Sequence, residues 1–156
     1  FDREFPGARG FGFIRRVPVA DQRVFLDKAR KDGWPEFSIR QFVSHPDERF
    51  VIQYIEPVER NLAAVGLDIA SEASRRDAAI KAMRTGEVQL TAPITLVQAS
   101  GKPQQSFLIL LPVFRGIVRP ATEEERERAT FGWTYAPLLM EEVLSGLATA
   151  RSGEMR

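Results

Sequence analysis

Short apolar runs separated by polar turns with proline or glycine are the feature that most restricts the fold of this 156-residue chain. Such runs predict β-strands, and tight turns between consecutive strands favour an antiparallel sheet over a doubly wound one. The predicted strands cover residues 10–17, 37–43, 50–55, 88–90, 94–97, 107–114 and 131–135. The strand that starts at Phe107 is predicted to be central and to end at Pro112, and a turn at His45 is predicted to close a hairpin.

Apolar residues at helical spacing predict helices between these strands. The predicted helices cover residues 21–32, 58–65, 71–85, 122–129 and 137–150. Ser71 is the predicted cap of the third helix, Thr122 and Glu125 form a capping box for the fourth, and Pro137 takes the first position of the last. The predicted fold class is therefore α+β, with helices packed against an antiparallel sheet.

Composition excludes several functions. Lys and Arg total 22 against 21 Asp and Glu, so the net charge of +1 provides no field for a nucleic-acid partner. No apolar run approaches the ~18 residues that span a bilayer, and the first residues lack signal-peptide features, so we expect this segment itself to be soluble. The absence of cysteine excludes disulfides and thiolate zinc sites. We expect no metal ion and no cofactor, and we interpret His45 as an exposed turn residue.

Residues 50–68 form an apolar run that breaks at Glu56-Pro57 and leads to a lone acid, Asp68, directly after Gly66. Asp68 has two interpretations. As a helix cap it would accept hydrogen bonds from free backbone N–H groups, and local rules favour this role. As a ligand contact it would lie at the lip of an apolar pocket and accept hydrogen bonds from ring or amine N–H groups of a small molecule.

Two other places invite a ligand. Arg75 and Arg76 offer cations, but adjacent helical residues point to different sides, so at most one faces inward. Pro93 interrupts a strand and leaves the backbone of Leu90 or the hydroxyl of Thr91 able to face a ligand. An edge strand with a kink explains the same pattern equally well.

The order of motifs adds a resemblance to these local patterns. FPGARGFGFIRRV, YIEP-x-x-x-N, VGLDIASEASRR, LTAPITL, LILLPVF and FGWTYAP-x-L follow one another along the chain. Together they resemble a CHASE domain over residues 5–147. CHASE domains are the extracytoplasmic sensory domains of bacterial histidine kinases and diguanylate cyclases and of plant cytokinin receptors.

The resemblance implies two PAS-like modules on a stalk helix between two transmembrane helices. Residues 11–114 would be the distal, ligand-binding module, and the strand and helix in 131–150 would begin or border the proximal one. The receptor would be homodimeric, periplasmic on this side, and anchored in the inner membrane only by flanking helices.

The same resemblance names site residues. In the cytokinin receptors an aspartate that matches Asp68 and a leucine backbone that matches Leu90 hold the adenine ring, and Thr91 follows here too. Tyr54 and Arg75 complete the ligand contacts that we expect. The YIEP-x-x-x-N stretch resembles bacterial members, and the QASGKPQQ loop differs in length from the plant pattern, so no cytokinin is inferred.

Three functions remain as hypotheses. The first, which the motif order favours, is a sensor of an unidentified small molecule with Asp68 as a ligand contact. The second is a structural, dimerisation or protein-interaction module whose pocket is filled by its own side chains. The third is acid–base catalysis by Glu56 and Asp68, which requires the two carboxylates to share one cleft. Under the first two, the domain itself is not an enzyme.

Overall fold

One sheet organises the computed structural model, which describes residues 8–97, 103–116 and 118–154. Within these residues the strands are β1 (Phe11–Val17), β2 (Arg40–Gln41), β3 (Arg49–Glu56), β4 (Leu67–Asp68), β5 (Gln89–Leu90), β6 (Ile94–Val97), β7 (Pro103–Phe114) and β8 (Thr130–Leu139). Their order is β2-β4-β3-β1-β8-β7-β5, with β6 also paired to β7. All pairs except β2 with β4 are antiparallel. The predicted PAS-like α+β fold is confirmed. Most of the QASGKPQQ loop and the start of the first motif lie outside the described residues.

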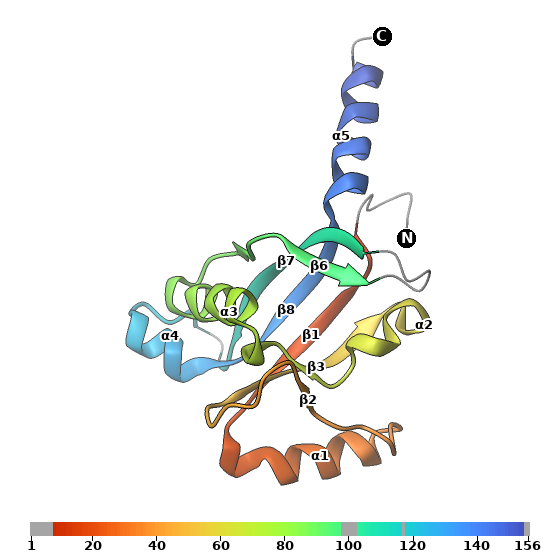
Figure 1. Ribbon diagram of the computed structural model, residues 1–156. Helices are drawn as coiled ribbons and strands as arrows, with labels where there is room; N and C mark the ends of the chain where they lie inside the picture. Colours follow the sequence, from red (N-terminus) through yellow and green to blue (C-terminus); the bar gives the residue numbers. More distant parts are fainter. Residues whose placement is uncertain (1–7, 98–102, 117, 155–156) are drawn as a thin grey trace.

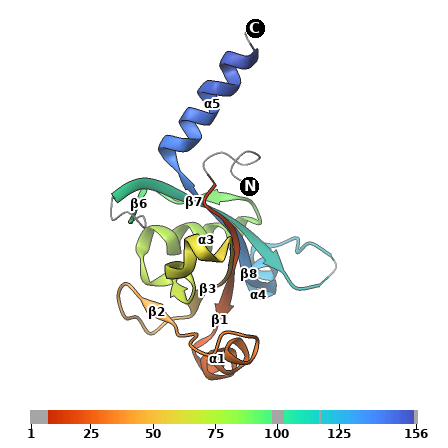
Figure 2. The same cartoon turned by 90° about the vertical axis from the view of Figure 1, so that its right-hand side faces the viewer.

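Helices flank this sheet and extend from its two ends. They are α1 (Gln22–Lys31), α2 (Val58–Asn61), α3 (Ala73–Thr85), α4 (Glu123–Ala129) and α5 (Met140–Glu154), with 3₁₀ turns at Val19–Asp21, Leu62–Ala64 and Ile69–Ser71. One half of the predicted capping box at α4 is confirmed, because the Thr122 hydroxyl accepts from the Glu125 N–H at 3.1 Å. The Glu125 carboxylate reaches one residue further back and accepts from the Ala121 N–H at 3.1 Å. Figures 1 and 2 show α1 at one end of the sheet and α5 projecting from the opposite end.

The predicted hairpin of residues 37–43 with 50–55 is wrong. The short strand β2 pairs in parallel with β4, and β4 lies between β2 and β3. Gly66 makes this insertion possible, because it adopts a φ of 90° and its backbone bonds both neighbours: its N–H donates to Ile52 at 2.8 Å and its carbonyl accepts from Arg40 at 2.9 Å. A Cβ at this position would lie 2.1 Å from the Ser38 carbonyl oxygen.

Two element boundaries that were predicted at prolines are wrong. Strand β7 continues through Pro112 to Phe114, and β8 continues through Pro137 to Leu139, so the last helix begins at Met140. The Pro137 carbonyl accepts from the Arg9 N–H at 2.8 Å, on the side away from β7. Since the N–H and C=O of a strand residue point to the same side, the missing proline N–H leaves the ladder to β7 intact.

Strand β8 lies at the centre of the sheet, between β1 and β7. The predicted module boundary after Phe114 therefore does not separate two sheets, because β8 belongs to the sheet formed by residues 11–114. The resemblance to the CHASE family implied the boundary, whereas β8 is hydrogen-bonded to β1 and β7 in one sheet. The idea that α5 borders a second module stays a prediction.

The core lies between the sheet and α3. Trp133 of β8 is fully buried, its ring packs 4.5 Å from that of Phe50, and its indole N–H donates to the Ala79 carbonyl of α3 at 2.9 Å. Small residues on α3, Ala79 and Ala82, are also fully buried, and they allow the helix to approach the sheet closely. We call the sheet face that packs against α3 the inner face.

Candidate functional site

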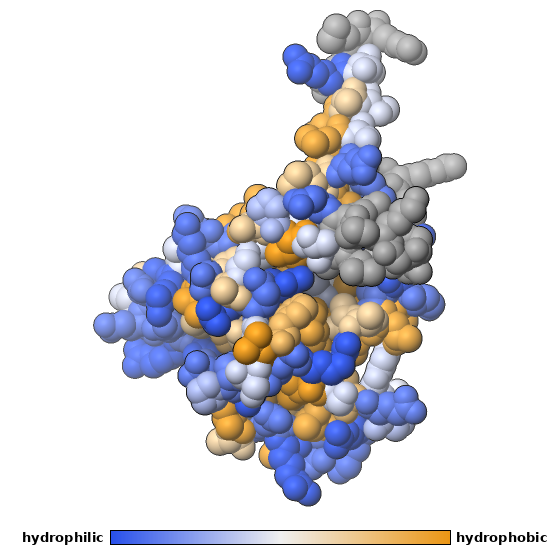
Figure 3. Space-filling model, viewed as in Figure 1, coloured by the Kyte–Doolittle hydropathy of each residue, from blue (hydrophilic) through white to orange (hydrophobic). Residues whose placement is uncertain are grey.

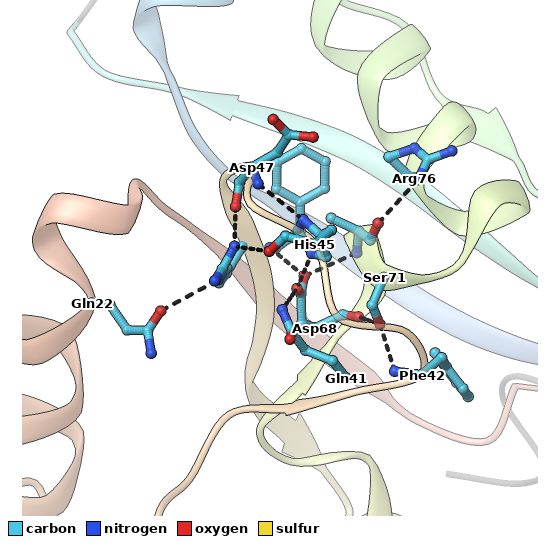
Figure 4. A network of polar contacts seen from close by, with 11 residues as sticks. Gln22, Gln41, Phe42, His45, Asp47, Asp68, Ser71 and Arg76 are labelled. Carbon is cyan, nitrogen blue, oxygen red and sulfur yellow. Dashed lines mark hydrogen bonds and ion pairs between the residues drawn. The ribbon is translucent and has the colours of Figure 1, made fainter.

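Asp68 lies at the centre of a buried polar network. Its side chain has no exposed surface, and each of its oxygens accepts two hydrogen bonds (Figure 4). One oxygen, Oδ1, accepts from the backbone N–H groups of Phe50 at 2.8 Å and Ala70 at 3.0 Å. The other, Oδ2, accepts from the side chains of Gln41 at 2.9 Å and His45 at 2.6 Å. The two oxygens thus have different kinds of partner.

The capping role of Asp68 is present, at a different element from the one predicted. Asp68 caps the 3₁₀ turn Ile69–Ser71, whereas the cap of α3 is Glu72, whose carboxylate accepts from the N–H groups of Ser74 and Arg75 at 2.9 Å each. The prediction that Ser71 caps α3 is wrong. Its hydroxyl instead donates to the Asp68 carbonyl at 2.6 Å and accepts from the Phe42 N–H at 2.8 Å.

His45 is not the exposed turn residue that we predicted. Only 14% of its side chain is exposed, because its ring turns inward to reach Asp68. The Asp47 N–H donates to Nδ1 at 3.2 Å, so Nε2 carries the ring N–H and donates it in a hydrogen bond to Asp68. The 23 residues between His45 and Asp68 hide this contact from any local pattern.

Arg75 lies beside the same loop and faces inward, as one of the two adjacent arginines was expected to do. It is 7% exposed, its guanidinium bonds the Glu72 carboxylate at 3.1 Å, and it stacks 4.8 Å from the Phe42 ring. Burial alone raises the pKa of Glu72, but the N–H groups of Arg75 and Ser74 and the Arg75 charge outweigh it, and that pKa lies below its ordinary value.

Leu90 and Thr91 lie at the other edge of the sheet from Asp68, with β3, β1, β8 and β7 between. Leu90 is 57% exposed and pairs with Ile109. The Thr91 hydroxyl is buried and accepts from the Leu108 N–H at 2.9 Å. The structure therefore does not bring these two residues to the Asp68 network.

Tyr54, the remaining predicted contact, is 55% exposed on β3, where its hydroxyl accepts from the Gln53 amide at 3.3 Å. Four hollows in the described part of the chain bear on the predicted site. Tyr54 lines two of them, and Asp68, Arg75, Leu90 and Thr91 line none of the four.

Two buried hydroxyls on the inner face escaped the sequence prediction. The Tyr135 hydroxyl of β8 and the Ser106 hydroxyl of β7 have no hydrogen-bond partner among the described residues. Tyr135 follows Trp133 by two residues, so it faces the same side of the sheet, and burial raises the pKa of its hydroxyl. A serine and a tyrosine within apolar strands carry no motif that would have marked them.

The acid–base hypothesis fails on geometry. Glu56 pairs with Phe11 at the end of β3 and is exposed, whereas Asp68 pairs with Val51 and is buried. Five positions along a strand separate these two sites on β3 by about 17 Å. The described residues also contain no cluster of three side chains able to hold a metal ion.

Comparison with known proteins adds one decisive observation. A model of the CHASE domain family matches residues 1–155. The chain belongs to the CHASE domain family. This match confirms the resemblance seen in the motif order. CHASE domains are extracytoplasmic sensory domains of signalling receptors and are not catalytic. A search of curated proteins found no match. Within the described residues of this CHASE domain, no helix has the length and apolarity needed to cross a membrane.

Proposed function

We propose that this CHASE domain senses a small molecule, and that Asp68 holds the ligand through Oδ2. The observation that carries the proposal is that the two carboxylate oxygens have different kinds of hydrogen-bond donor. Oδ1 is fixed by backbone N–H groups, whereas Oδ2 is bonded only by the side chains of Gln41 and His45. Side chains exchange partners by rotation, so a ligand can replace them without breaking a strand.

The chemistry at Oδ2 indicates the class of ligand. The His45 imidazole N–H and the Gln41 amide N–H already bond this carboxylate oxygen; Gln41 is the last residue of β2, and His45 lies on the segment between β2 and β3. A ligand with ring or amine N–H donors would replace them bond for bond. A hydrogen bond to a charged group is worth about 1.5–3 kcal/mol whichever partner supplies the N–H, so net affinity has to come from apolar burial.

Arg75 supports the same location from the other side of the loop. Its ring partner Phe42 is bonded through its N–H to Ser71, whose hydroxyl bonds the Asp68 carbonyl. A ligand that moves His45 and the loop therefore changes the surroundings of Arg75. The contributions of Leu90, Thr91 and Tyr54 to ligand binding stay predictions.

Strand β8 and helix α5 offer the route for the signal. They are contiguous, β8 is hydrogen-bonded along both sides, and α5 projects from the body of the domain. Figure 3 shows apolar side chains along α5, and its Leu144 and Leu147 are 61% and 63% exposed. These leucines are three residues apart and suit a helix-to-helix contact in the homodimeric receptor that we propose, a periplasmic sensor joined to a kinase or cyclase output domain.

A thermal-shift screen of adenine derivatives, amino acids and small carboxylates tests the proposal. The informative variant is Asp68→Asn, because its amide oxygen still accepts at the Oδ1 position while its NH₂ group cannot accept at Oδ2. The matched control is Asp47→Asn, because the Asp47 contacts use backbone atoms only. We expect a ligand that stabilises the parent chain and Asp47→Asn but not Asp68→Asn. Equal stabilisation of all three would reject the site.

A structural or protein-interaction module is the second candidate function. It is favoured by the complete satisfaction of Asp68 by the chain itself and by the aromatic filling of the core by Trp133 and Phe50. Sedimentation of the chain with and without the Leu144→Glu change separates the two. A dimer lost in this variant, together with an empty ligand screen, would favour the second candidate.

A further inference from the structure

A groove runs between α1 and the sheet face opposite α3, away from the Asp68 network. Its volume is about 870 Å³, within the usual range for small-molecule sites. Phe13 and Arg15 of β1 line it, and these residues flank the buried Ile14, so alternation along the strand turns them to this outer face. Helix α1 supplies the opposite wall with Val24 and Lys28.

Two β-bulges shape the floor of the groove. Pairing between β1 and β3 skips Gln53, and pairing between β7 and β8 skips Phe131, so each is the extra residue of a bulge. Both residues line the groove. A bulge redirects a side chain at the expense of regular pairing, and bulges concentrate next to functional sites.

Aromatic rings line this floor. The Phe13 and Phe131 ring centroids lie 5.6 Å apart, and the two ring planes are tilted by 46° to each other. Gly132 makes room for them, because a Cβ there would lie 2.4 Å from the Phe13 ring. Tyr54 borders the same surface with 55% of its area exposed. The floor therefore presents aromatic side chains to the groove where strands usually present polar groups to water.

Two arginines frame the Phe131 ring. The guanidinium carbons of Arg15 and Arg115 lie 5.3 Å and 5.9 Å from its centroid. Within the described residues neither arginine has a carboxylate partner, whereas the neighbouring Arg16 is bonded to Glu48 at 3.0 Å. The groove also contains carboxylates: Asp21 and Asp32 on the α1 side, Glu48, which is the partner of Arg16, and Glu127, which is paired with Arg84 at 3.2 Å. Positive charge without a partner is thus concentrated at the aromatic floor.

We infer that this groove binds a small aromatic carboxylate. Its ring would stack on one of the tilted rings of Phe13 and Phe131 and meet the edge of the other, and its carboxylate would bond the guanidinium groups of Arg15 and Arg115. Arginine suits this task, because its planar fork matches a carboxylate while its face stays on an aromatic ring. This is a second binding site, separate from the Asp68 site of the proposed function.

Isothermal titration of the chain with benzoate and 2-naphthoate tests the inference, with benzamide, 2-naphthamide and acetate as matched comparisons. We expect the aromatic acids to bind at least tenfold more tightly than the amides and acetate. Arg115→Gln and Arg15→Gln should each weaken the acids about tenfold, as expected for loss of a charged hydrogen bond. Arg23→Gln, an exposed arginine of α1 outside the groove, should leave the affinity unchanged.

Several results would overturn the inference: no binding of either acid, equal binding of acid and amide, equal binding of acetate, or acid binding that survives Arg115→Gln. A dimer that forms through this groove and excludes the acids would overturn it too. Asp68→Asn should leave 2-naphthoate binding intact, so failure of one site is distinguishable from failure of the other.

Discussion

Replacing Asp68 tests how much of the fold depends on its buried carboxylate. Asp68→Ala leaves the buried N–H groups of Phe50 and Ala70 without an acceptor. Each buried donor without a partner costs about 1–3 kcal/mol, so we expect a loss of about 4 kcal/mol from the free energy of unfolding. That is a large share of the 5–15 kcal/mol typical of a domain.

Asp68→Asn separates the two oxygens in the same assay. Its amide oxygen can still accept from the two backbone N–H groups, and only the charged contact with Gln41 and His45 is lost. Each of these two hydrogen bonds to a charged oxygen is worth about 1.5–3 kcal/mol, but the Gln41 amide can rotate and accept from the Asn NH₂ group, so we expect a net loss of about 1–2 kcal/mol. Asp47→Asn, whose backbone alone makes contacts, should stay within about 0.5 kcal/mol of the parent.

Urea unfolding and thermal unfolding at pH 7, both followed by circular dichroism, measure these differences. Melting temperatures should fall by about 12 °C for Asp68→Ala and by about 5 °C for Asp68→Asn, because 1 kcal/mol shifts a domain of this size by about 2–4 °C. If Asp68→Ala unfolds within 1 °C of Asp47→Asn, the carboxylate does not hold the loop and the backbone together as described.

Three further changes have defined outcomes. Folding lowers the pKa of Glu72 from its ordinary value of 4.5. The stabilisation by this carboxylate is therefore present above pH 4.5 and is lost as the pH falls through the pKa of the folded state. Glu72→Gln should flatten the acid limb of a curve of stability against pH. Gly66→Ala should lower the free energy of unfolding by about 3 kcal/mol, because the residue has a φ of 90° and an added Cβ would collide with the Ser38 carbonyl. The control Gly33→Ala has a φ of 98° but open space around the Cβ, and it should lose about 1 kcal/mol in the same urea titration. Trp133→Phe should lose about 1–3 kcal/mol with the indole hydrogen bond to α3, and an unchanged urea midpoint would contradict that role.

Local rules located most of the elements, because each has a local cause. The α4 capping box and the helix cores follow from spacing and end signals that lie within a few residues. The short strand β4 could not be predicted, since two residues carry no periodicity and its place beside β3 depends on Gly66. The ends of β7 and β8 were predicted wrongly at prolines, because the effect of a proline on a strand depends on which side of the strand its nitrogen faces.

The candidate site was predicted in part. Asp68 stood out because an acid between apolar residues is unusual, and the structure does place it in the interior. Its partner His45 was misjudged, because a turn motif describes the backbone and says nothing of a side chain reaching across 23 residues. The aromatic floor of the groove could not be predicted either, since Phe131 faces outward through a bulge that only strand pairing creates.

The imidazole of His45 provides the most direct test of ligand binding at Asp68. His45 is the only histidine of the chain, so its ring nitrogens give an unambiguous nuclear magnetic resonance signal. When a hit from the ligand screen is added, we predict that the Nε2–H signal moves from its hydrogen-bonded position to that of a solvent-exposed imidazole, and that Asp68→Asn shows the shifted position without ligand. A ligand that binds while the His45 signal stays in place would contradict the exchange at Oδ2.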